Sequence, residues 1–156
     1  MARKPDQEVS FGLLSTLSDD ELRAFFECGI RKVIARNQDV LRQGQRNGSL
    51  FLVLEGALRI LRTIDRNDLT LGRLEPGSFF GEISLFDPGP ATATVRAAGR
   101  SVVVEIRREH LDHYVAAHPQ PGARVLLALL EDVARRFRHT DERLRDLVHW
   151  RNAVTE

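Results

Sequence analysis

The residues with the clearest chemical potential lie in one short stretch, in which a carboxylate directly follows a glycine. Residues 79–86 read as a strand, a tight turn at Gly81 and one turn of helix from Glu82, and residues 88–95 lead into a further strand. Free amides at the start of a helix attract an anion, and a neighbouring carboxylate can accept a hydrogen bond from a sugar hydroxyl. The stretch therefore predicts a site for a sugar phosphate, although no Arg or Lys lies between Glu82 and Val95 to meet the phosphate.

Length and composition describe an ordinary globular domain. The chain has 156 residues, 42% of them hydrophobic and 29% charged, which suits a single hydrophobic core. Its 23 Lys and Arg against 22 Asp and Glu leave a net charge of +1, which argues against a dedicated nucleic-acid-binding protein with a basic face. Cys28 is the only cysteine, so no disulfide can form within the chain. The N-terminus lacks the apolar core of a signal peptide, and no apolar run approaches the ~20 residues that span a membrane. These features predict a cytoplasmic protein that does not contact a membrane.

The pattern along the chain predicts one domain, residues 1–156, whose first two parts are a helical segment and a β-roll. In the first part, about residues 11–30, Ser18 and Glu21 have the spacing of a helix capping box. Between residues 31 and 108, short apolar runs alternate with Gly, Asn and Asp turns at intervals of about 8–12 residues, which indicates a sandwich or barrel of many short strands.

The third part, about residues 109–151, is predicted to be helical. A short helix over 108–117 ends before the Pro-rich and Gly-containing segment 118–122. From about Ala123 to Arg151 no Pro or Gly interrupts the chain, and a helix of that length would span roughly 40 Å.

A heptad seam runs along the predicted long helix. Its members recur at alternating steps of four and three residues: Leu126, Leu130, Val133, Phe137, Thr140, Leu144, Leu147 and Arg151. Such a seam either packs on the β-roll or pairs with its copy in a second chain, and the length of the helix favours pairing of at least its second half. The arginines beside the seam, among them Arg135, Arg136 and Arg138, are interpreted as a solvated face.

Thr140 is the polar exception in this apolar seam. Its hydroxyl could bond back to its own helix backbone, which requires no function. It could instead meet a ligand held between the roll and the helix, across a dimer. Periodicity alone leaves both interpretations open.

Five stretches in a fixed order carry a resemblance to a known family: residues 41–44, 51–56, 80–85, 94–97 and 134–140. Taken together, the chain resembles a cyclic nucleotide-binding domain, in the style of the sensor half of bacterial catabolite activator proteins. The resemblance covers almost the whole chain. It implies an α+β fold: a double-stranded β-roll of the jelly-roll type, with N-terminal helices and a long C-terminal helix through which two chains form a homodimer.

The resemblance also implies a ligand-binding set. Its members are Gly81, Glu82, Ile83, Ser84, Ala91, Thr92, Ala93 and Thr140. Glu82 matches the carboxylate that binds the ribose 2′-hydroxyl, and Gly81, Ile83 and Ser84 match positions that present backbone amides near the sugar and phosphate. Thr92 matches a small residue whose hydroxyl or amide touches the phosphate. Thr140 falls where activator-like members read adenine with a threonine hydroxyl.

The chain departs from the family pattern at Ala91, where family members that bind cyclic nucleotides usually have an arginine paired to the phosphate. A charge-assisted contact of this kind contributes roughly 1.5–3 kcal/mol, or about 10- to 150-fold in affinity. Residues 87–90 add a negative charge and two prolines near the expected phosphate. Arg73 or Arg96 could reach in to replace the missing cation.

The sequence thus predicts a ligand-sensing regulatory module that binds cAMP or cGMP weakly, or an altered ligand, and signals through its C-terminal helix. The alternative is a ligand-free pseudo-sensor that acts as a dimerisation or protein-interaction domain. Because the chain ends at Glu156 without a helix-turn-helix, we expect no DNA binding by this chain alone. We expect no enzymatic activity, no metal and no obligatory cofactor, since the five histidines lack a compact metal spacing and Cys28 is expected to be buried rather than reactive.

Overall fold

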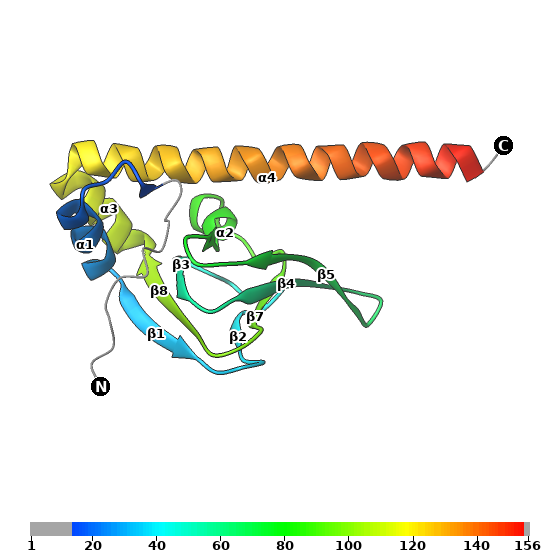
Figure 1. Ribbon diagram of the computed structural model, residues 1–156, viewed down its shortest axis with the longest axis horizontal. Coiled ribbons are helices and arrows are strands. Elements are labelled where there is room, and N and C mark those ends of the chain that lie inside the picture. Colours follow the sequence, from blue (N-terminus) through cyan, green and yellow to red (C-terminus); the bar gives the residue numbers. More distant parts are fainter. Residues whose placement is uncertain (1–13, 155–156) are drawn as a thin grey trace, which may run out of the picture.

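Two antiparallel sheets with helices against one of them form the molecule, whose computed structural model describes residues 14–154 (Figure 1). The elements are α1 (Asp19–Glu27), β1 (Ile30–Ile34), β2 (Asp39–Leu41), β3 (Ser49–Glu55), β4 (Leu58–Ile64), β5 (Asn67–Leu74), β6 (Phe79–Phe80), α2 (Glu82–Phe86), β7 (Thr94–Ala97), β8 (Ser101–Arg107), α3 (Arg108–Ala117) and α4 (Pro119–Val154). One sheet has the strand order β1-β8-β3-β6 and the other β2-β7-β4-β5. The predicted α+β β-roll with a long C-terminal helix is confirmed, while residues 11–13 of the predicted N-terminal part lie outside the described residues.

Within the first sheet, strand β3 is buried on both faces, which explains its unbroken apolar run. Leu50 and Leu52 point to a core shared with α1, α3 and α4, whereas Phe51 and Val53 point to a second core between the two sheets. The side chains alternate because successive residues of a strand face opposite sides. Both faces therefore carry large apolar side chains, and β3 forms the centre of the molecule.

The predicted capping box starts α1. The Ser18 backbone N–H donates to Glu21 Oε2 at 2.9 Å, and the Glu21 N–H donates to Ser18 Oγ at 3.3 Å. The two bonds satisfy backbone donors that the first turn of a helix leaves without a partner.

Directly after α1, the Cys28 thiol donates to the Phe25 carbonyl, and burial raises the pKa of Cys28 to about 11, so the thiol stays protonated.

The long helix starts earlier than the sequence predicted. α4 begins at Pro119 instead of Ala123 and runs to Val154, three residues beyond the predicted end. A proline is tolerated in the first turn of a helix because its missing N–H would have had no acceptor there. Gly122 also lies in the first turns of α4, where its missing side chain lets α3 pack closely. A Cβ on Gly122 would lie 2.8 Å from the Val115 Cα. The Pro-rich segment thus makes a tight corner between two helices.

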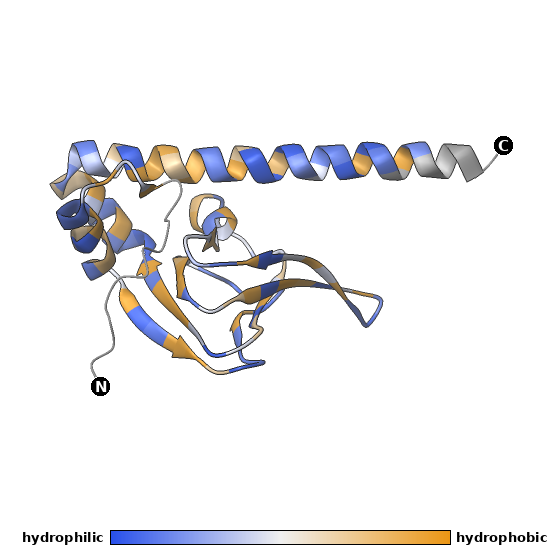
Figure 2. Ribbon diagram, in the orientation of Figure 1, coloured by the Kyte–Doolittle hydropathy of each residue, from blue (hydrophilic) through white to orange (hydrophobic). Residues whose placement is uncertain are grey.

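Two stripes of α4 have different surroundings. Val125, Ala128 and Leu129 are buried against the helical core. The predicted seam lies on another side of the helix, and its larger members are exposed to solvent: Leu130 by 63%, Val133 by 37%, Phe137 by 75% and Leu144 by 56%. Figure 2 shows isolated apolar positions among mostly hydrophilic ones along the half of α4 that extends beyond the helical core.

The interpretation that the whole seam packs on its own β-roll is therefore wrong for these four positions. Leu126 is partly buried against the core, while Leu147 and Arg151 lie outside the side chains that the structure describes. Within the described part of the chain, no helix is both long and apolar enough to cross a membrane.

Candidate ligand-binding site

The turn between β6 and α2 places the candidate carboxylate. Gly81 has a φ of 83°, a left-handed conformation that glycine adopts without steric cost. The Asn47 side-chain amide holds this turn, because its Nδ2 donates to the Gly81 carbonyl at 3.2 Å and to the Ser49 carbonyl at 2.7 Å. Glu82 follows as the first residue of α2, where the chain turns back toward the interior.

Glu82 is almost completely buried, with 4% of its surface exposed. It is paired with an arginine from the long helix: the Arg136 Nη1 lies 3.2 Å from Glu82 Oε1. The same guanidinium pairs with Asp132 one turn earlier on α4, at 2.5 Å, and donates to the Phe79 carbonyl. Burial raises the pKa of Glu82 above its usual range, and the charge of Arg136 offsets part of this rise. The carboxylate is therefore desolvated but has a cation beside it.

A small cavity of about 80 Å³ lies in front of Glu82. Its lining residues come from four strands, α2, the turn before β7, and α4: Leu41, Ile60, Phe80, Gly81, Glu82, Ile83, Ser84, Ala91, Thr92, Ala93, Val95 and Arg136. The walls are mostly apolar, with the carboxylate and the guanidinium as the charged groups. Pockets that hold small molecules usually measure ~300–1,000 Å³, so a nucleotide would have to enlarge this one.

The structure brings seven of the eight predicted ligand-binding residues together around this cavity. The exception is Thr140, which is exposed and whose hydroxyl donates to the Arg136 carbonyl at 3.0 Å. That bond is the local helix contact expected of a threonine without a ligand. In the single chain Thr140 therefore does not reach the cavity.

Arg136 is the site residue that sequence reasoning missed, since it was interpreted as part of a solvated face. It is half-buried and lines the cavity. One signal was present: Val125, Leu129, Asp132 and Arg136 follow each other at steps of four, three and four, which places them on one face of the helix. The apolar members of this stripe are buried, and the two charged members are partly buried on the same side of the helix.

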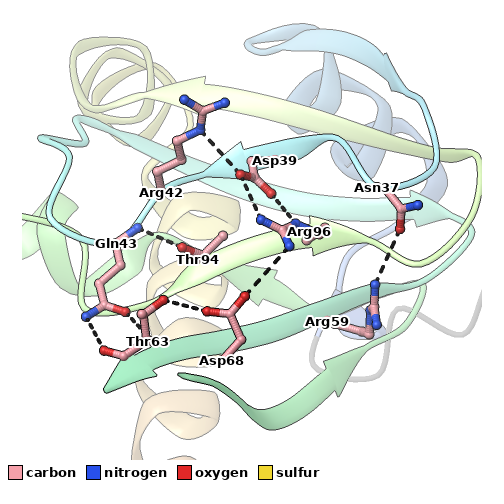
Figure 3. A network of polar contacts seen from close by, with 9 residues as sticks. All are labelled: Asn37, Asp39, Arg42, Gln43, Arg59, Thr63, Asp68, Thr94 and Arg96. Carbon is pink, nitrogen blue, oxygen red and sulfur yellow. Dashed lines mark hydrogen bonds and ion pairs between the residues drawn. The ribbon is translucent and has the colours of Figure 1, made fainter. Parts of the chain in front are cut away.

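Neither arginine predicted to replace the missing cation reaches the cavity. Val95 lines the cavity, so Arg96, the next residue of β7, points to the opposite face of the sheet. There it binds Asp39 through Nε at 2.6 Å and Nη2 at 3.2 Å, in the polar network of Figure 3. Arg73 pairs with Glu75 at 3.4 Å and does not line the cavity.

The Asp39–Arg96 pair leads to a prediction for acid stability. The hydrogen bonds from Arg96 hold the pKa of Asp39 below its usual range, so the folded chain binds this proton less readily than the unfolded chain. The stabilisation is therefore complete above the unfolded pKa of about 3.9 and is lost as the pH falls through the lower, folded pKa. We expect Asp39→Asn to lower the free energy of unfolding by about 1–3 kcal/mol at pH 7, and by much less near pH 3.

Urea unfolding at both pH values measures this difference. Asp146→Asn, at an exposed position on α4, is the matched control and should change the stability little at either pH. Equal stability of the wild type and Asp39→Asn at pH 7 would contradict the prediction.

Comparison with known proteins identifies the family. The family model described as "Cyclic nucleotide-binding domain" matches residues 31–118. The "CRP-like cAMP-activated global transcriptional regulator" of Mycobacterium tuberculosis is 31% identical over 114 residues, which are 72% of this chain and 49% of the relative. This chain thus spans about half the length of that relative.

Solved structures show the same fold. The catabolite activator protein of Thermus thermophilus is 31% identical with a TM-score of 0.75, over 86% of this chain and 62% of that one. The c-di-GMP-responsive global regulator CLP of Xanthomonas campestris is 26% identical with a TM-score of 0.73, over 80% and 62%. With the β-roll, the Gly81–Glu82 turn and the cavity in place, this chain belongs to the cyclic nucleotide-binding domain family.

Proposed function

We propose that the domain is a ligand-sensing regulatory module whose cavity binds a cyclic mononucleotide, cAMP or cGMP. Glu82 accepts a hydrogen bond from the ribose, and the phosphate lies toward the turn that carries Ala91, Thr92 and Ala93. The observation that carries the proposal is the meeting of these segments, which lie about ten residues apart in the sequence, at one cavity with a buried carboxylate. Glu82 is paired with Arg136 through Oε1, and a carboxylate has further acceptor positions to which a ligand hydroxyl can donate.

The names of the relatives support this class of ligand. The Mycobacterium regulator is described as cAMP-activated, and the Xanthomonas regulator as responsive to c-di-GMP. The proposal therefore includes an altered ligand of the cyclic nucleotide class, bound weakly because Ala91 offers no charge to the phosphate. Control of transcription would belong to a longer protein, and the expectation that these residues alone do not bind DNA stays a prediction.

The first test is isothermal titration with cAMP and cGMP up to millimolar concentration. We expect saturable binding to the wild type and a loss of about 10- to 100-fold in Glu82→Gln, since the variant lacks the charged acceptor for the ribose hydroxyl. Glu75→Gln, which changes an exposed glutamate outside the cavity, is the matched control and should bind like the wild type. No heat with either nucleotide would contradict the proposal.

A pseudo-sensor is the second candidate function. It is favoured by the small cavity and by Arg136, which already occupies the carboxylate that a ribose would need. Such a domain would act through its exposed helix seam, with Leu130, Phe137 and Leu144 available to a second apolar surface.

We propose for either function that this seam joins two copies of the chain, because a stripe of large exposed apolar side chains at heptad spacing is typical of paired helices.

A further inference from the structure

A positive charge strengthens the binding of a phosphate, and the turn before β7 supplies none at this cavity. Ala91 contributes a buried methyl group, and its backbone N–H already donates to the Gln45 carbonyl at 2.8 Å. Arg96 and Arg73 are bound by carboxylates away from the cavity. Among the residues that line the cavity, Arg136 is the one with a positive charge.

Arg136 is held by contacts that a ligand could replace. Its guanidinium binds Glu82 at 3.2 Å, Asp132 at 2.5 Å and the Phe79 carbonyl. A guanidinium has five N–H donors in a planar arrangement and can bind a phosphate through two parallel hydrogen bonds. If a ribose hydroxyl donates to Glu82 in place of Arg136, the Arg136 Nη1 donors become available to the phosphate. Asp132 continues to hold the Arg136 side chain in place.

We propose that Arg136 supplies the cation for the ligand's phosphate in place of the arginine that Ala91 lacks, exchanging Glu82 for the phosphate when the ligand enters. This inference rests on the proposed function of the same cavity. In the absence of ligand, the paired Glu82 and Arg136 side chains narrow the cavity. The exchange separates them, so the cavity enlarges as the ligand enters. The residue that binds the phosphate would then lie on α4, next to the exposed Phe137. In the usual family pattern that residue lies in the β-roll, at position 91.

The test is titration of four proteins with cAMP: the wild type, Arg136→Gln, Ala91→Arg and the double variant. In the wild-type background we expect Arg136→Gln to lose about 10- to 150-fold in affinity. In the Ala91→Arg background, where the turn provides the cation, the same change should cost less than about threefold. Arg136→Lys keeps the charge without the bidentate geometry and should fall between the wild type and Arg136→Gln.

Adenosine, which has the sugar and base without the phosphate, separates recognition from positioning. We expect Arg136→Gln to weaken cAMP much more than adenosine. Equal losses for both ligands would mean that Arg136 only positions Glu82, and tighter cAMP binding by Arg136→Gln would mean that Arg136 only competes with the ligand; either result overturns the inference.

The same experiment distinguishes failure of the inference from failure of the proposed function. If the wild type binds cAMP and Arg136→Gln binds it equally well, the proposed function stands but Arg136 does not act as the cation. If the wild type binds neither cAMP nor cGMP while it remains folded by circular dichroism, the proposed function fails and the inference fails with it.

Discussion

Replacing Gly81 by Ala is expected to lower the free energy of unfolding by about 2–5 kcal/mol, which is a large part of the stability of a small domain. Two costs add. At a φ of 83° an L-residue pays roughly 1–2 kcal/mol for the left-handed conformation. The new Cβ would also lie 2.6 Å from the Ser49 carbonyl oxygen and 2.9 Å from Asn47 Nδ2, so β3 or the Asn47 clamp has to shift. Because Glu82 follows directly, the shift would also move the candidate carboxylate.

Gly44→Ala is a matched control for the conformational part of this cost. Gly44 has the same φ of 83°, but a Cβ there meets nothing within 4 Å. We expect this variant to lose only the roughly 1–2 kcal/mol of the left-handed conformation. Chemical denaturation of both variants measures the difference, and equal losses would show that the close contact with Ser49 and Asn47 has no role.

The second large effect concerns oligomeric state: Phe137→Asp is expected to convert the proposed dimer into a monomer. Phe137 is the most exposed large apolar residue of the described chain, at 75%, and it lies in the seam with Leu130, Val133 and Leu144. A charge at its position in a paired helix would be desolvated without a partner, which costs several kcal/mol for each copy. Light scattering of the purified protein measures the mass directly.

Leu127→Asp is the control for this variant. Leu127 is an exposed leucine on the same helix, 57% accessible, but it lies about 80° around the helix axis from Phe137 and outside the seam. We expect it to leave the dimer intact. The same mass for wild type and Phe137→Asp would contradict the proposed pairing, and a monomeric Leu127→Asp would mean that a different face of α4 forms the contact.

Local sequence signals predicted those elements whose cause is also local. The side chains of Ser18 and Glu21 each accept a hydrogen bond from the other residue's backbone N–H across one helical turn. This pattern is visible within four residues of sequence. Asp65 and Arg66 turn the β4–β5 hairpin in one of the polar segments that separate the short apolar runs of residues 31–108. The start of α4 was misplaced because Gly122 usually interrupts a helix, whereas here its missing Cβ lets α3 approach, which is a contact between elements.

In the candidate site too, the features with a local cause were predictable, and those set by contacts between distant residues were not. Gly81 and Glu82 were recognisable because a left-handed glycine and the following carboxylate form one short segment, and the resemblance to the family supplied the residues of the turn before β7. Which cations reach the cavity was not predictable. Arg96 is excluded by strand alternation together with its bond to Asp39, 57 residues away, and Arg136 meets Glu82 across 54 residues.

By itself, then, the sequence determined the order of strands and helices, the left-handed turn before Glu82, the apolar seam of α4 and the absence of an arginine at position 91. Only the tertiary structure decided that Arg136 enters the cavity, that Thr140 does not, and that the seam faces solvent. The physical reason is the rotation of α4 about its own axis, which is set by the packing of Val125, Ala128 and Leu129 on the helical core. A heptad pattern shows which residues share a face of the helix, but the packing of the core decides what each face meets.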